Sequence, residues 1–299
     1  RVAMAMYPGT IDQLESGYTG TDQWDCIYLG DEKIWPTSSY LTPIIQQISE
    51  ETGNYPIHFC EFNNSLDQTP IPSSSDPNQV YKPYSWASWP STYNFLEGVA
   101  GRKALYCSTT DIKLDLSVKH PKRVCASMLI KQTSTNSSYS GVLGGTIFGL
   151  NTKGFGYALG WSPSVQSNKF CAECYAGSGS AAAAYSSTSM TANKWYHVMV
   201  DFQADSLTAT QNSPRAHICI NGTWVRDISY PGKLGELDYS SLSEKQNDSY
   251  IHLGCVWQNG KYYFKGYIQD FVLWTNFSLY DNPTLDKLIV DYYKGLNVI

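Results

Sequence analysis

Short apolar runs separated by turn residues dominate this chain, and they predict strands. From residue 57 onward, runs such as "RVCASMLIK", "GFGYALGW" and "KGYIQDFVLWT" are rich in β-branched and aromatic residues and are bounded by Gly, Pro, Ser or Asn. In "HICINGTWV", Asn221 and Gly222 both tolerate positive φ, which predicts a hairpin with a type I′ turn. Many strands with almost no helix predict an all-β fold, a two-sheet antiparallel sandwich.

The strand predicted from the segment "NKWYHVMVDF", residues 193–202, has apolar side chains on both faces. Alternation puts Tyr196 and Val198 on one face and Trp195 and His197 on the other. A strand with one face in water would not carry this pattern. We therefore expect loops and chain ends to cover Trp195 and His197. No catalytic partner for His197 is evident, so we interpret it as a packed, hydrogen-bonded side chain.

Two segments have the periodicity of helices. The segment "LTPIIQQISEETGN" has Thr42 as a candidate cap, Pro43 in the first turn and Gly53 as the stop. The segment "NPTLDKLIVDYYKG" predicts a helix at about 283–294, with Asn282 as its cap.

The first 56 residues differ from the rest of the chain. "DCIYLGDEKIWP" predicts a short hairpin, which precedes the first predicted helix. We therefore expect an N-terminal attachment element at 1–56, made of a hairpin and a short helix, and a sandwich domain at 57–299.

Composition and charge narrow the class of function. Charged residues make up 16% of the chain, below the ~25% of a typical globular protein, whereas there are 23 Tyr and 9 Trp. The net charge is −5 and there is no run of Lys or Arg, which disfavours nucleic-acid binding. No apolar stretch approaches the ~18 residues of a membrane span, so we expect no membrane insertion.

The eight cysteines fall mostly within apolar, strand-like runs, where a free thiol behaves as a small hydrophobic side chain. We therefore favour buried free thiols over a disulfide framework. The pair Cys171 and Cys174 forms a CxxC motif, but the second pair that a zinc site needs is missing. We expect no metal site.

Four motifs in order resemble the laminin-G-like, concanavalin-A-like jelly rolls, a group that includes the pentraxins. The resemblance covers about residues 57–295 and implies a jelly roll with a short helix near its C-terminal end. The matching residues are Trp195, His197, Asn221, Gly222, Leu253, Gly254, Phe264, Gly266, Ile268 and Trp274.

The resemblance also raises two kinds of chemistry. Several members bind calcium through loop carboxylates and amides, but this chain has no contiguous acidic loop, and Asp67 and Asp111 are interpreted as turn residues. Related folds host glycoside hydrolases, which need two facing carboxylates. Glu236 and Asp238 are the nearest candidates, and the third acid of the usual pattern is absent. We therefore predict no catalytic residues and no cofactor, with calcium implied only by the resemblance.

The sequence offers more candidate residues for glycan binding than for catalysis, because sugars stack their apolar faces on aromatic rings. Two aromatic-rich loops offer candidate ligand-binding residues. These are Tyr81, Tyr84, Trp86 and Trp89 in the first loop, and Trp257, Asn259, Tyr262 and Tyr263 in the second. Loop anchoring and contact with another subunit are equally good explanations for these rings.

The N-terminal "IYLGDEKIWP" resembles a short element of phage and prophage tail proteins of gut bacteria, which often append a laminin-G-like module. This implies a virion or extracellular location. The resulting prediction is a non-enzymatic tail or fibre protein that forms a homo-oligomer and contacts a glycan or host surface receptor and other virion subunits. The alternatives are a secreted or cell-surface adhesion module, a structural virion protein and, on the same fold, a glycoside hydrolase.

Overall fold

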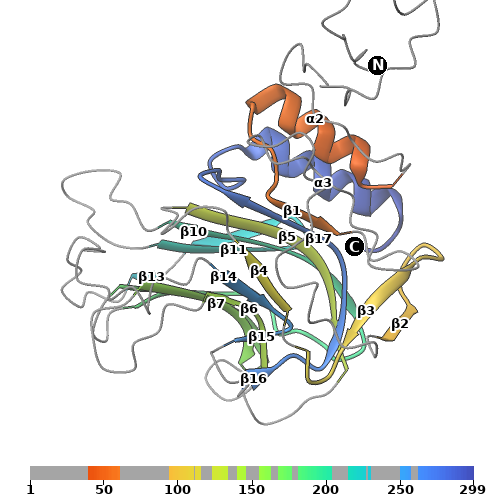
Figure 1. Ribbon diagram of the computed structural model, residues 1–299, viewed down its shortest axis with the longest axis vertical. Coiled ribbons are helices and arrows are strands. Elements are labelled where there is room, and N and C mark those ends of the chain that lie inside the picture. Colours follow the sequence, from red (N-terminus) through yellow and green to blue (C-terminus); the bar gives the residue numbers. More distant parts are fainter. Residues whose placement is uncertain are drawn as a thin grey trace, which may run out of the picture.

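The computed structural model describes residues 40–60, 94–110, 112–115, 123–133, 140–145, 155–162, 168–176, 181–203, 215–226, 228–229, 250–256 and 262–299. In these residues two sheets face each other, and the two helices lie on the outer face of one of them (Figure 1). We call the sheet beneath the helices the helix-side sheet and the other the second sheet. The predicted fold class, an antiparallel β-sandwich with a C-terminal helix, is confirmed.

The helix-side sheet has the strand order β12-β11-β10-β5-β17-β3-β2, and β1 pairs with β17 off this path. All of these pairings are antiparallel. Its strands are β1 (His58–Cys60), β2 (Asn94–Glu97), β3 (Lys103–Cys107), β5 (Arg123–Gln132), β10 (Trp195–Gln203), β11 (Arg215–Ile220), β12 (Thr223–Arg226) and β17 (Gly266–Thr275).

The second sheet has the strand order β13-β9-β8-β7-β6-β14-β4, with β15 and β16 attached through β6. In this sheet β16 pairs with β6 in parallel, and all other strand pairs of the described residues are antiparallel. Its strands are β4 (Ile112–Asp115), β6 (Ser140–Gly145), β7 (Phe155–Ser162), β8 (Lys169–Ala176), β9 (Ala181–Tyr185), β13 (Ile228–Ser229), β14 (Tyr250–Leu253), β15 (Cys255–Val256) and β16 (Tyr262–Tyr263).

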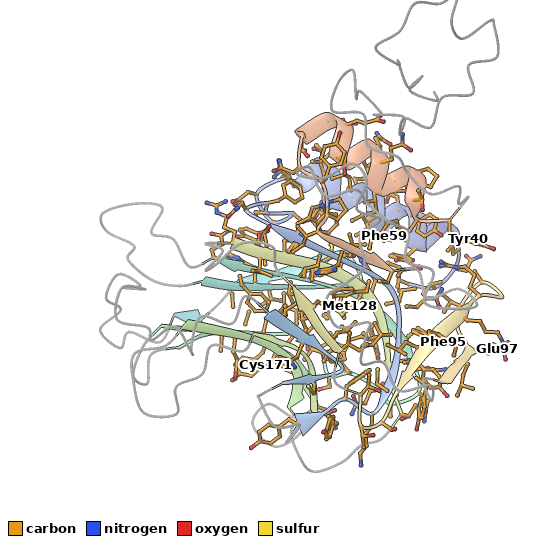
Figure 2. All side chains as sticks on the ribbon, viewed as in Figure 1. Tyr40, Phe59, Phe95, Glu97, Met128 and Cys171 are labelled. Carbon is orange, nitrogen blue, oxygen red and sulfur yellow. The ribbon has the colours of Figure 1, made fainter. Side chains whose placement is uncertain are left out.

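The main hydrophobic core lies between the sheets. Met128 and Val198 of the helix-side sheet are fully buried there, together with Leu159 and Phe170 of the second sheet. Figure 2 shows Met128 in this layer. Alternate residues of each strand supply the core, as the sequence pattern predicts.

A second hydrophobic cluster fills the space between the helix-side sheet and the helices α2 (Thr42–Thr52) and α3 (Pro283–Gly295). Ile45 and Ile289 of the helices meet Met199 and Trp274 of the sheet, and all four are fully buried. The helices are therefore the cover that the apolar second face of β10 requires.

The ends of the helices show where local sequence patterns succeed. Gly53 caps α2 in the left-handed conformation, at φ 70°, as predicted. Asn282 is the N-cap of α3, and its side-chain amide donates to the Ser278 carbonyl oxygen at 2.7 Å.

The predicted cap at Thr42 is wrong. Thr42 is already helical, and the N-cap is Leu41, which makes no side-chain cap hydrogen bond. Leu41 is fully buried in the second cluster. Burial of this side chain therefore decides where the helix begins.

The hairpin between β11 and β12 has the predicted turn, with φ 51° at Asn221 and 86° at Gly222. A Cβ atom at Gly222 would lie 2.8 Å from Cγ1 of Val290, so this turn packs tightly against α3. The prediction of a hairpin before residue 40 lies outside the described residues. The boundary at residue 56 stays a prediction.

Six cysteines are free and buried: Cys60, Cys107, Cys125, Cys171, Cys219 and Cys255. This confirms the thiol prediction for these residues, whereas Cys26 and the side chain of Cys174 lie outside the description.

Candidate functional site

Four side chains on adjacent strands form a straight row across the outer face of the helix-side sheet. Trp195 of β10 pairs with Lys131 of β5, Lys131 pairs with Tyr267 of β17, and Tyr267 pairs with Tyr106 of β3. We call these four residues the cross-strand row. Directly opposed residues project from the same face of a sheet, so the pairing brings the side chains together.

Alternation decides which face carries the row. The neighbours Tyr196, Ile130, Ile268 and Leu105 all lie in the core between the sheets. The row therefore points outward, and all four of its side chains are half-buried.

The rings of the row are in mutual contact. The ring centroids of Tyr106 and Tyr267 are 5.1 Å apart, and those of Trp195 and Tyr267 are 6.1 Å apart. Lys131 Nζ lies 4.2 Å from the Tyr267 centroid and 5.0 Å from the Trp195 centroid, a cation–π geometry with both rings. The row is thus an aromatic surface with one cation held within it.

The row lies at the edge of the helix cover. His197 lies two residues after Trp195 on the same face of β10. It is fully buried, and the centroid of its ring lies 4.6 Å from that of Tyr293 on α3. Trp195 packs partly against the second cluster but stays half-buried. The expectation that the cover extends over both residues holds fully for His197 and in part for Trp195, which lies at the edge of the cover.

His197 is the packed, hydrogen-bonded residue that we predicted. Its Nε2 lies 2.9 Å from Ser127 Oγ, and burial lowers its pKa from 6.5 to about 3. A Ser–His pair has the atoms of a nucleophile and a base. Both side chains are fully buried beneath the helix cover, so the pair stabilises packing and has no access to a substrate.

A buried ion pair fixes the cover in place. Arg102 donates both terminal nitrogens to the Asp270 carboxylate at 2.6 Å, and Tyr293 Oη donates to the same carboxylate at 3.1 Å. Asp270 lies in a bulge of β17 with φ 55°, a conformation that Asp tolerates better than most residues. The bulge thus connects the β2–β3 turn to α3.

A second buried carboxylate, Asp201 of β10, lies under the segment that links β17 to α3. Ser278 Oγ donates to it, and the Asp281 backbone N–H donates to the same hydroxyl oxygen at 3.0 Å. Burial raises the pKa of Asp201 to about 7, only partly offset by the Ser278 hydrogen bond. Asp281 pairs with Arg123 at 3.0 Å.

Most of the ligand-binding residues predicted from sequence lie outside the described residues: Tyr81, Tyr84, Trp86, Trp89, Trp257 and Asn259. Tyr262 is 38% exposed and Tyr263 is half-buried, and both belong to β16 of the second sheet. They are therefore not part of the cross-strand row. The candidate acids Glu236 and Asp238, and the loop residues Asp67 and Asp111, also lie outside the described residues.

Our sequence analysis missed Tyr106, Lys131 and Tyr267. Each is an aromatic or basic residue at an outward position of an otherwise apolar strand. This alternation was the signal in the sequence that could have indicated an outward-facing binding surface.

Within the described ranges, no group of three or more His, Cys, Asp or Glu side chains is placed to hold a metal ion. Neither of the helices described is long and apolar enough to cross a membrane.

Several solved structures are similar to this chain at low sequence identity. Domain 4 of AbnA, an extracellular arabinanase from Geobacillus stearothermophilus in complex with arabinotriose, is 15% identical with a TM-score of 0.43, over 66% of this chain and 82% of that one. The binding domain of botulinum neurotoxin serotype C1 is 12% identical with a TM-score of 0.41, over 66% and 45%. A Trypanosoma rangeli sialidase is 10% identical with a TM-score of 0.41, over 63% and 27%. The chain thus spans less than half of the neurotoxin and sialidase chains.

Among curated protein sequences, none matches this chain. A family model described as the concanavalin A-like lectin/glucanases superfamily matches residues 108–277, which is more than half of the chain. The protein therefore belongs to the concanavalin A-like lectin/glucanases superfamily.

Proposed function

We propose that this protein is a non-enzymatic glycan-binding module and that the cross-strand row is its contact surface. The observation that carries the proposal is the alignment of Trp195, Tyr267 and Tyr106 on one outward face, with ring centroids 5.1 and 6.1 Å apart. Aromatic rings that are partly exposed offer flat apolar area at low conformational cost, which suits the apolar faces of sugar rings.

The dimensions of the row favour an extended ligand. Neighbouring strands are ~4.8 Å apart, so the row spans about 14 Å from β10 to β3. Four paired strands hold its side chains, and their backbones are fixed by the core beneath. Such a platform is preorganised and loses little entropy on binding.

We further propose that the module works in a bacteriophage virion, as a tail or fibre protein at the extracellular surface of the host. The support is the resemblance of "IYLGDEKIWP" to phage tail proteins. A secreted adhesion module and a structural virion protein are the alternatives for the same fold. A glycoside hydrolase is the third, and its nearest candidate acids are Glu236 and Asp238.

The test is a binding measurement that separates the two candidate surfaces. Polysaccharide binding is measured by affinity electrophoresis for Tyr267→Ala and Tyr106→Ala, and for the loop variants Trp86→Ala and Trp257→Ala. We expect the row variants to weaken binding at least tenfold, in the range of central aromatic contacts. Tyr55→Ala is the matched control, because Tyr55 is a half-buried tyrosine near the opposite end of β17.

Each outcome decides between the surfaces. Loss of binding in the loop variants alone would locate the glycan site in residues 81–89 or 257–263 and refute the row. Unchanged melting temperatures are required for any loss to be assigned to contact. Failure of the loop and row variants to assemble, with no glycan affinity of the wild type, would favour the structural virion protein.

A further inference from the structure

We propose that the ligand of the cross-strand row is an acidic polysaccharide and that Lys131 pairs with its anionic groups. This inference rests on the proposed function and deepens it, because it names the chemical class of the glycan. It starts from how the ammonium group of Lys131 is held.

The Lys131 ammonium lies against two aromatic rings and not against an acid. Its Nζ is 4.2 Å from the ring centroid of Tyr267 and 5.0 Å from that of Trp195. Within the described part of the chain, no carboxylate forms an ion pair with it. Cation–π contacts fix the position of an ammonium group but use none of its three N–H donors, which stay available to an anion.

Three basic side chains near the helices form ion pairs. Arg102 pairs with Asp270, Arg123 pairs with Asp281, and Lys287 pairs with Asp291. Lys131 differs from these three, because its ammonium group lies between two aromatic rings. Lys131 is thus positioned as an anion receptor.

A second lysine extends the positive charge along the same face. Beyond the row, the Thr133 backbone N–H donates to the Lys265 carbonyl oxygen at 2.9 Å, and Thr133 Oγ1 donates to the same oxygen at 3.0 Å. This continues the pairing of β5 with β17 by one residue beyond Gln132 and Gly266, so alternation puts Lys265 on the same outward face as Tyr267. Lys265 is exposed.

Two lysines among aromatic rings match a chain of sugars that carries a charge at intervals. The rings provide area for the apolar faces of the sugars, and the lysines provide the counter-charges. Nucleic acid would require a larger basic footprint than two lysines in an acidic protein. The geometry therefore points to carboxylated or sulfated polysaccharide.

The experiment compares three polymers: polygalacturonate, which carries carboxylates, dextran sulfate, which carries sulfates, and dextran, which is neutral. Affinity electrophoresis of the wild-type chain is run against each at low and at high salt. We expect binding to at least one acidic polymer, weakened at high salt, and at least tenfold weaker binding to dextran. Which acidic polymer binds distinguishes carboxylate from sulfate as the source of the charge.

Variants then test the role of Lys131. Lys131→Met keeps the apolar stem and removes the charge, and we expect it to lose at least tenfold in affinity for the acidic polymer and to lose most of the salt dependence. Lys131→Arg should retain binding. Lys287→Met, which removes one charge from an exposed position on α3, is the control for net charge and should bind as the wild type does.

The failures of the two proposals are distinguishable. Equal binding of dextran and the acidic polymers, or unchanged acidic binding by Lys131→Met, would overturn the acidic class and leave the glycan-binding function standing. Binding of none of the three polymers and of no host polysaccharide would overturn the proposed function and this inference with it. Tighter binding of single-stranded DNA than of every polysaccharide would also overturn it.

Discussion

Replacing Asp201 by Asn should change how the stability of the fold depends on pH. Asp201 is fully buried on the outer face of β10, and its carboxylate accepts a hydrogen bond from Ser278. Asn has nearly the same shape and never ionises. The substitution thus removes the titration of this side chain while it keeps the packing.

The magnitude follows from the raised pKa of Asp201, about 7 in the fold against an ordinary value of 3.8. Below pH 4 the carboxyl is protonated in both the folded and the unfolded chain. Between pH 4 and 7 the unfolded chain loses this proton and the folded chain keeps it, so the free energy of unfolding decreases as the pH rises. A difference of roughly three pKa units corresponds to about 4 kcal/mol, fully developed above pH 7.

Other titrating groups face the same carboxylate or lie on the same strand. Asp281 and Arg123 lie close enough to affect the pKa of Asp201, and His217 and Cys125 are its cross-strand partners. His197 acts in the opposite direction. Because its folded pKa is lowered to about 3, stability is lost as the pH falls below 6.5. The difference between the wild type and Asp201→Asn cancels these shared contributions.

The assay is urea unfolding of both chains at pH 4.5, 6 and 8. We expect Asp201→Asn to gain stability relative to the wild type as the pH rises, by about 3 kcal/mol between pH 4.5 and pH 8. Asp291→Asn, on the exposed side of α3, should follow the wild type within ~0.5 kcal/mol at each pH. Parallel pH profiles for Asp201→Asn and the wild type would refute the reasoning, since Asp201 would then be ionised or solvated in the fold.

Three further predictions concern stability. Arg102→Met should cost ~3–5 kcal/mol in urea unfolding, because it leaves the Asp270 carboxylate buried without its partner, and a loss under ~1 kcal/mol would contradict the importance of this ion pair. A thiol reagent should leave Cys60, Cys107 and Cys219 unmodified in the native chain and modify them after denaturation, because burial raises each pKa to about 12; rapid native modification would contradict their burial. Trp195→Ala should cost less than the ~3–5 kcal/mol of a fully buried tryptophan, and a loss in that range would show that the cover extends over the ring.

Local signals in the sequence were sufficient for several elements. The positive φ angles at Asn221 and Gly222 follow from residue types that tolerate them, and α3 follows from a Pro near its start and regular apolar spacing. The cap at Thr42 could not be predicted in the same way. Its failure comes from Leu41, which the second cluster buries, and that cluster contains residues from distant strands.

The cross-strand row could not be assembled from the sequence for a different reason. Alternation shows that Tyr106, Lys131, Trp195 and Tyr267 each face away from the core, but it does not show which strands are neighbours or in which register they pair. Tyr267 lies between Tyr106 and Lys131 only because β17 inserts between β3 and β5. A shift of one residue in either pairing would turn Tyr267 to the core face and remove the row.

The division of one sheet face between a helix cover and an open row has a consequence for function. The helices bury the cross-strand pair His197 and Leu129 and leave the next pair on the same face, Trp195 and Lys131, half-buried. Strand β10, which carries Trp195, continues beneath the helices. There it is packed on both faces, at Met199 against the helices and at Val198 in the core between the sheets. Binding at the row should therefore need little rearrangement and carry a small cost in conformational entropy. Calorimetry of polysaccharide binding by the wild-type chain measures this entropy directly.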